Sequence, residues 1–168
     1  SIPTTGNLSD PLLKIIDMCI EADVVFNFGH LSGYESVALA EIVAKRGMTR
    51  MLCPAAYLTL QEAKEIRNFG CFLEYSFFVF SHATDVSQTM IDSEFHRFPR
   101  ANFDQAVDII KTLGPDGFVL SSDSGAIVLP PPIEAFREFI LMFRNSGIND
   151  SDIKKMISQN PKHLFKLS

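Results

Sequence analysis

A histidine and an aspartate follow two apolar segments, at positions where α/β proteins often carry reactive groups. The segment Val24–Phe28 leads into His30, and the segment Gly117–Leu120 leads into Asp123. Short apolar runs are typical of buried parallel strands, whose carboxyl ends commonly bear the chemistry. Histidine can bind a metal, and a carboxylate can act as a general base. We therefore expect His30 and Asp123 to share one site.

A cysteine occupies the same kind of position in a third segment. Cys53 ends the expected strand Arg50–Cys53, so we expect its side chain at the same mouth of the sheet as His30 and Asp123. A thiolate can bind zinc, although a buried cysteine usually behaves as a small apolar side chain. His30 and Asp123 also have structural interpretations, as a donor to a backbone carbonyl and as a turn residue.

Strand-like and helical segments alternate along the chain. The expected strands are Val24–Phe28, Arg50–Cys53, Cys71–Phe80 and Gly117–Leu120. The expected helices are one that begins at Ser9 or Asp10, Gly33–Arg46, one capped by Thr59 and Glu62 and ended by Gly70, Phe103–Leu113, Ile133–Asn145 and about Asp152–Ser158. This pattern predicts an α/β fold of parallel (βα) units, as an open doubly wound sheet or a piece of a barrel. No strand is followed by a Gly-rich phosphate loop, which disfavours nucleotide-binding folds.

Composition and charge limit the classes of protein to which this chain can belong. The chain has 168 residues, of which 46% are hydrophobic, so we expect residues 1–168 to form a single α/β unit. Its net charge of -5 disfavours nucleic acid as a partner. No apolar run approaches the roughly 18 residues that span a bilayer. The 3 cysteines favour free thiols in the cytoplasm over a disulfide framework. The first residue is Ser1, which suits a piece of a longer protein.

Three motifs, in order and spacing, resemble the second half of the amidohydrolase superfamily, and most closely a little-characterised group of metal-dependent hydrolases in it. They are Gly29-His30-Leu31-Ser32, Ser121-Ser122-Asp123-Ser124-Gly125 and Asn160-Pro161-Lys162-His163-Leu164-Phe165. The resemblance maps the ends of strands five to eight of that family onto His30, Cys53, Tyr75 and Asp123. It implies a distorted eight-stranded barrel, with metal ligands at the first two positions, a variable third and a catalytic aspartate.

The resemblance also implies a cofactor. One or two divalent metals are expected, zinc first, with manganese or iron as alternatives, held by His30, Asp123 and Cys53. A metal lowers the pKa of its bound water to about 7, and Asp123 would accept the proton as hydroxide attacks a carbonyl.

Two departures from the family pattern affect this expectation. Cys53 stands where the family usually has histidine, and the His-x-His pair of the first strand and the bridging residue of the fourth are absent. The chain alone therefore lacks part of the metal site. A half-barrel exposes its edge strands and inward faces, so we expect it to associate with another copy or with a chain carrying the first four strands.

Two further regions offer candidates for substrate binding. Arg97 and Arg100, in the irregular segment 81–101, could pair with an anionic substrate, although solvated charge is the default interpretation. Tyr75 lies on a strand of which one face would point into a barrel, and the role of the adjacent Glu74 stays undecided.

The leading hypothesis is metal-dependent hydrolysis of a C–N or ester bond in a small molecule. One alternative is a degenerate, non-catalytic barrel in which Cys53 marks the loss of metal. The other is a metal-free hydrolase with Cys53 as nucleophile, His30 as base and Asp123 as the orienting group. Metal analysis and sensitivity to thiol reagents distinguish these possibilities.

Overall fold

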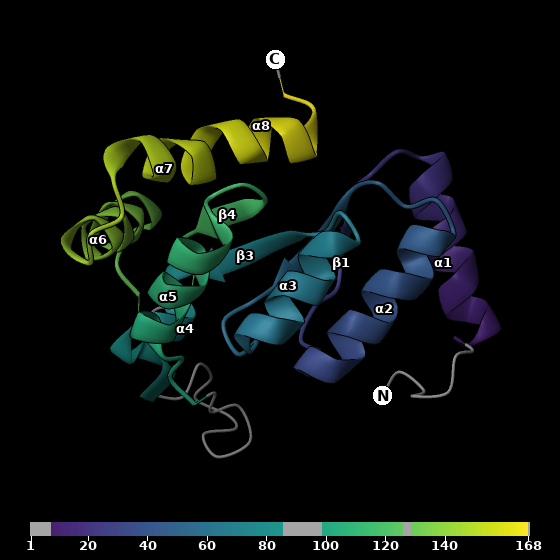
Figure 1. Ribbon diagram of the computed structural model, residues 1–168, viewed down its shortest axis with the longest axis horizontal. Helices are drawn as coiled ribbons and strands as arrows, with labels where there is room; N and C mark the ends of the chain where they lie inside the picture. Colours follow the sequence, from purple (N-terminus) through teal and green to yellow (C-terminus); the bar gives the residue numbers. More distant parts are fainter. Residues whose placement is uncertain (1–7, 86–98, 126–128, 168) are drawn as a thin grey trace.

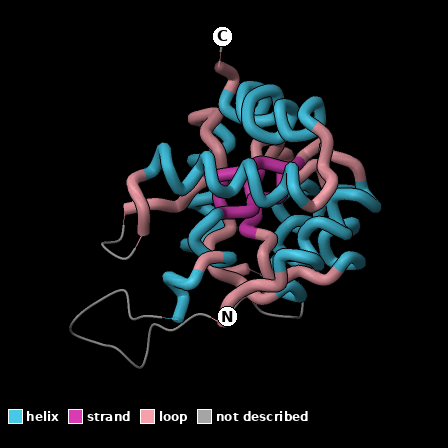
Figure 2. Tube along the Cα trace, turned by 90° about the vertical axis from the view of Figure 1, so that its left-hand side faces the viewer, coloured by secondary structure: helices cyan, strands magenta, loops and turns pink. Residues whose placement is uncertain are grey.

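Four short parallel strands form the centre of the fold (Figures 1 and 2). The computed structural model describes residues 8–85, 99–125 and 129–167. The strands are β1 (Phe26–Asn27), β2 (Met51–Pro54), β3 (Phe72–Ser76) and β4 (Phe118–Ser121). The helices are α1 (Asp10–Glu21), α2 (Gly33–Lys45), α3 (Leu60–Asn68), α4 (Phe77–Phe80), α5 (Phe103–Leu113), α6 (Pro132–Asn145), α7 (Asp150–Lys154) and α8 (Asn160–Phe165).

The strand order decides between the two architectures that the sequence left open. The strands lie in the order β1-β2-β3-β4, so each crossover places the next strand on the same side of the last. A doubly wound sheet would reverse direction at a switch point, whereas a barrel adds its strands in sequence around an arc. The sheet is therefore barrel-like.

Capping boxes fix the starts of two helices beside the sheet. The Ser32 hydroxyl accepts a hydrogen bond from the Glu35 backbone N–H at 3.3 Å, and the Glu35 carboxylate accepts one from the Ser32 N–H at 3.1 Å. Thr59 and Glu62 make the same reciprocal pair at the start of α3, as the sequence predicts. Two N–H groups at each helix start, which have no partner within the helix, are satisfied in this way.

The apolar segment 71–80 is not one strand. β3 ends at Ser76, and Phe77–Phe80 form the single helical turn α4. An unbroken apolar run does not distinguish a buried strand from a buried helix. The rings of Phe77 and Phe80 pack on Phe139 of α6, with centroids 6.0 and 5.7 Å apart, so α4 fills the space above the end of β3.

The final helical region is longer than expected. Residues 150–165 are helical throughout, with a π-helical segment, Lys155–Gln159, between α7 and α8. The side chain of Asn160 is buried and donates hydrogen bonds to the carbonyls of Pro115, at 2.8 Å, and Phe118, at 2.6 Å. These bonds attach α8 to β4.

The two faces of the sheet are covered differently. Strand residues such as Cys53, Leu73 and Tyr75 point into the large core beneath the helices, where α3 lies between α2 and α5. On the opposite, inner face, Leu52 and Val119 form a small separate cluster with Leu164, Val25 and Phe72. Leu164 belongs to α8, so this helix covers the amino-terminal end of the inner face. The carboxyl-terminal end of that face is open.

Within the described residues, no helix is both long and apolar enough to cross a membrane.

Candidate active site

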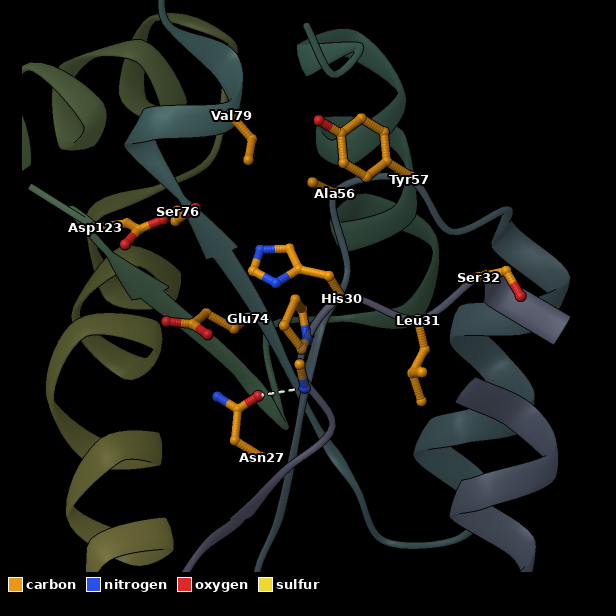
Figure 3. Close-up of a pocket in the computed structure, with 12 residues that line it drawn as sticks. Asn27, His30, Leu31, Ser32, Ala56, Tyr57, Glu74, Ser76, Val79 and Asp123 are labelled. Atoms are coloured by element: carbon orange, nitrogen blue, oxygen red, sulfur yellow. Dashed lines mark hydrogen bonds between the residues drawn. The ribbon is translucent and has the colours of Figure 1, made fainter. Parts of the chain in front are cut away.

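A pocket of about 520 Å³ opens at the carboxyl ends of the four strands (Figure 3). Its polar lining consists of Asn27, His30, Ser32, Glu74, Ser76 and Asp123. Its apolar walls include Leu31, Pro54, Ala56, Tyr57 and Val79. β1, β2 and β3 and the loops after β1, β2 and β4 all contribute, so the pocket lies where parallel α/β folds commonly place their active sites.

The loop after β1 delivers His30 to the pocket. Gly29 has a φ of +65°, a conformation that favours glycine, and its N–H donates to the Asn27 side-chain oxygen at 2.8 Å. The chain then enters the capping box of α2 at Ser32, so the loop is fixed at both ends. Figure 3 shows the His30 ring between Tyr57 on one side and the carboxylates of the pocket on the other.

Asp123 lies in the turn that follows β4. Its φ of +48° is left-handed, which aspartate tolerates better than most residues. Partial burial raises the pKa of Asp123, while the nearby His30 lowers it. The hydroxyls of Ser121 and Ser124, on either side of Asp123, are buried without a hydrogen-bond partner among the described residues. The structure thus brings His30 and Asp123 to the same pocket.

Glu74 is a pocket residue to which the sequence analysis assigned no role. It lies on β3, between Pro54 of β2 and Val119 of β4, and it points to the inner face with its carboxylate in the pocket (Figure 3). Burial raises the pKa of Glu74, the neighbouring Ser121 hydroxyl lowers it, and the charge of Asp123 raises it further. Strand alternation alone did not indicate whether Glu74 or its neighbour would face the pocket.

Cys53 and Tyr75 are not brought to the pocket. Both are 0% exposed and lie in the core on the helix-covered face of the sheet. Burial raises the pKa of Cys53 to about 12, so its sulfur stays a thiol at neutral pH, and it donates weakly to the Pro54 carbonyl at 3.5 Å. Tyr75 stacks on Phe118 with ring centroids 5.6 Å apart. Pro54 and Glu74, one residue away in each strand, take the pocket positions.

Of the two arginines that could pair with an anionic substrate, Arg100 is described and does not line this pocket. Arg97 lies outside the described residues. Arg100 is exposed, and its guanidinium lies 3.1 and 3.2 Å from the two ring nitrogens of His82. The adjacent Pro99 carbonyl accepts a hydrogen bond from the Tyr57 hydroxyl at 2.7 Å, which holds one wall of the pocket.

The donor set fits a divalent metal only in part. His30 and Asp123 are of the right chemical type. Over residues 8–85, 99–125 and 129–167, however, no group of three His, Cys, Asp or Glu side chains is arranged to hold an ion. Cys53 is turned away and protonated, so it does not supply the third ligand. These residues do not make a complete metal site.

Comparison with known families and curated proteins identifies no activity. Residues 2–74, fewer than half of the chain, match a family whose description is "Family of unknown function (DUF6282)". No curated protein matches the sequence.

Solved structures establish the fold. One is a variant of an organophosphorus hydrolase from Deinococcus radiodurans, 16% identical, with a TM-score of 0.54 over 79% of this chain and 43% of its own. Another is an enzyme engineered for organophosphate hydrolysis from a weak promiscuous lactonase template, also 16% identical, with a TM-score of 0.61 over 90% of this chain and 50% of its own. The chain has the α/β fold of parallel (βα) units found in these hydrolases and spans about half their length.

Proposed function

We propose that this chain is part of a metal-dependent hydrolase of the amidohydrolase type, which cleaves a C–N or ester bond in a small molecule. The observation that supports the proposal most directly is the pocket at the carboxyl ends of the four strands, which holds both His30 and Asp123. The fold shared with two hydrolases and the three sequence motifs are consistent with it. We further propose that the chain corresponds to the second half of the barrel.

Asp123 has the chemistry and placement of a general base. In the proposed reaction its carboxylate accepts a proton from a water molecule as the water oxygen bonds to the carbonyl carbon of the substrate. The same proton then passes to the departing alcohol or amine when the C–O or C–N bond breaks. His30, opposite in the pocket, is placed to contact the carbonyl oxygen or to bind a metal. Leu31 and Val79 also line the pocket and give it an apolar surface that suits an apolar part of a substrate.

A divalent metal, zinc, manganese or iron, would polarise the carbonyl and activate the water. His30 and Asp123 would be its ligands in this chain, and the remaining ligands would have to come from outside the described residues.

The burial of Cys53 argues against the cysteine hydrolase alternative. A nucleophilic cysteine needs a lowered pKa and access to the substrate, and Cys53 has neither. The non-catalytic alternative is left, and it differs from the proposal in predicting no turnover and no bound metal.

The test is the turnover of a panel of small lactones, esters and amides by the purified chain, with and without added zinc or manganese. Asp123→Asn should lower turnover by about a hundredfold or more, because the amide is isosteric but not basic. Asp108→Asn, an exposed site on α5, is the matched control and should leave turnover unchanged. Normal turnover in Asp123→Asn would exclude Asp123 as the base. Absence of turnover together with absence of bound metal would favour the non-catalytic alternative.

We also propose that four further (βα) units complete the barrel, supplied by a second copy or by another chain. Supporting this, large apolar side chains are exposed on both outer helices: Ile15 and Met18 on α1, and Ile133 and Leu141 on α6. Exposed apolar groups at the two flanks of an open sheet are typical of covered interfaces. Sedimentation of the purified chain tests this. A dimer indicates a second copy, whereas a compact monomer with cooperative unfolding would contradict the half-barrel proposal.

Cytoplasmic location is likewise a proposal, consistent with the free thiols of all 3 cysteines.

A further inference from the structure

Glu74 is held at the floor of the pocket by the centre of the sheet. Its strand is paired on both sides, and its own backbone carbonyl accepts a hydrogen bond from the Ala55 N–H at 2.8 Å. Directly beneath it on the same face lies Phe72, two residues earlier in the strand and part of the small apolar cluster under α8. The Glu74 carboxylate therefore lies above an apolar layer, in the pocket that also holds Asp123 (Figure 3).

Among the described residues that line the pocket, His30 is the one basic side chain, and it lowers the pKa of Asp123. Among the described residues that line the pocket there is no lysine or arginine, and the second carboxylate is that of Asp123. The neighbouring Ser121 hydroxyl lowers the pKa of Glu74 but makes no hydrogen bond of normal geometry. An ionised carboxylate above an apolar layer is costly unless a positive group pairs with it. An anionic ligand would meet two negative charges in the same space.

The shape and lining of the pocket indicate what kind of cation fits. Glu74 does not join two other His, Cys, Asp or Glu side chains in an arrangement that could hold a metal ion, within the described residues. The pocket is also lined by the ring of Tyr57 and by the aliphatic residues Leu31 and Val79. A pocket of about 520 Å³ with such walls suits an organic molecule that has both an apolar part and a positive charge.

We infer that the pocket takes a substrate bearing a primary ammonium group, and that Glu74 binds this group at the pocket floor while the scissile bond lies between His30 and Asp123. The inference rests on the proposed hydrolase function and names its substrate class. The inferred substrate is a cation, whereas Arg97 and Arg100 would pair with an anionic substrate. A charge-assisted hydrogen bond from the ammonium to Glu74 supplies both affinity and orientation.

Binding of unreactive probes tests the ammonium site apart from catalysis. Cyclopentylamine and cyclopentanol have the same ring and differ in charge, and each is titrated into the full chain by NMR in the presence of a chelator. We expect the amine to bind about tenfold more tightly than the alcohol, a preference of about 1.4 kcal/mol. Glu74→Gln should abolish the preference, and salt should weaken it in the unmodified chain. Glu138→Gln, an exposed site on α6, removes the same charge outside the pocket and should keep the preference.

The contrary outcomes are equally specific. Equal binding of the two probes, or a preference that persists in Glu74→Gln, overturns the inference. Zinc binding that is lost in Glu74→Gln would make Glu74 a metal ligand and also overturns it.

A turnover assay separates this inference from the proposed function. If α-amino-γ-butyrolactone and γ-butyrolactone are hydrolysed equally well through Asp123, the hydrolase proposal stands and the ammonium site fails. If the amine binds through Glu74 but no ester, lactone or amide is cleaved, the ammonium site stands and the hydrolase proposal fails.

Discussion

Replacement of Asn160 by alanine should destabilise the fold more than any exposed asparagine replacement. The Asn160 amide donates to two carbonyls, those of Pro115 and Phe118. The Pro115 carbonyl keeps a second partner, the Phe118 N–H at 3.2 Å. Loss of the hydrogen bond from Asn160 to Pro115 therefore costs about 0.5–1.5 kcal/mol. The bond to the Phe118 carbonyl is buried, and an unsatisfied buried acceptor costs about 1–3 kcal/mol. The expected loss in the free energy of unfolding is therefore about 1.5–4.5 kcal/mol.

Urea unfolding followed by circular dichroism measures this loss, at one fixed protein concentration because the chain is expected to associate. Asn145→Ala, at the exposed end of α6, is the control and should change the free energy of unfolding by less than about 0.5 kcal/mol. Asn160→Asp should destabilise at neutral pH, because it offers an oxygen to two carbonyls in place of a donor. If Asn160→Ala costs no more than the control, the two hydrogen bonds do not hold α8 on β4 and the reasoning is refuted.

Three further outcomes are expected. Because the folded pKa of Glu74 is raised, its contribution favours the fold at low pH and is lost as pH rises through that pKa. The stability of Glu74→Gln should therefore fall less than that of the unmodified chain between about pH 4 and pH 8 in urea titrations. A methyl group at Gly33 would collide with the Glu62 carboxylate. Gly33→Ala should therefore break the capping box of Thr59 and Glu62 and lower the free energy of unfolding by about 1 kcal/mol, as measured by thermal or urea unfolding. In the folded chain, a thiol reagent should modify the half-buried Cys19 but not Cys53, and an early reaction of Cys53 would contradict its burial.

Much of the fold was accessible from local sequence signals. The pair Thr59 and Glu62 marks the start of α3 because a capping box needs only residues three apart. The helix α5, Phe103–Leu113, has the bounds expected from its apolar spacing. The strand expected over Cys71–Phe80 was too long, because the choice between strand and helix at Phe77 depends on the ring of Phe139 on another element.

The site was predictable in its location but not in its orientation. His30 and Asp123 follow their strands in loops, so their arrival at the carboxyl edge depends only on strand direction. Residues inside a strand point to one face or the other, and a shift of one residue exchanges the faces. Cys53 and Tyr75 therefore proved to be core residues, while the pocket received Pro54 and Glu74. Which face a helix will cover is a long-range property that alternation alone does not specify.

The packing of α8 across the inner face limits the sides from which a ligand can enter or leave the pocket. Leu164 and its apolar neighbours close the amino-terminal end of this face beneath Glu74. The described part of the pocket is thus closed on its amino-terminal side, and it is open at the carboxyl ends of the strands and along the free edges of the sheet. In the proposed reaction, water and substrate would therefore enter from sides other than the one that α8 covers. A product fragment held by Glu74 would lie deepest in the pocket and would leave after the fragment nearer the mouth.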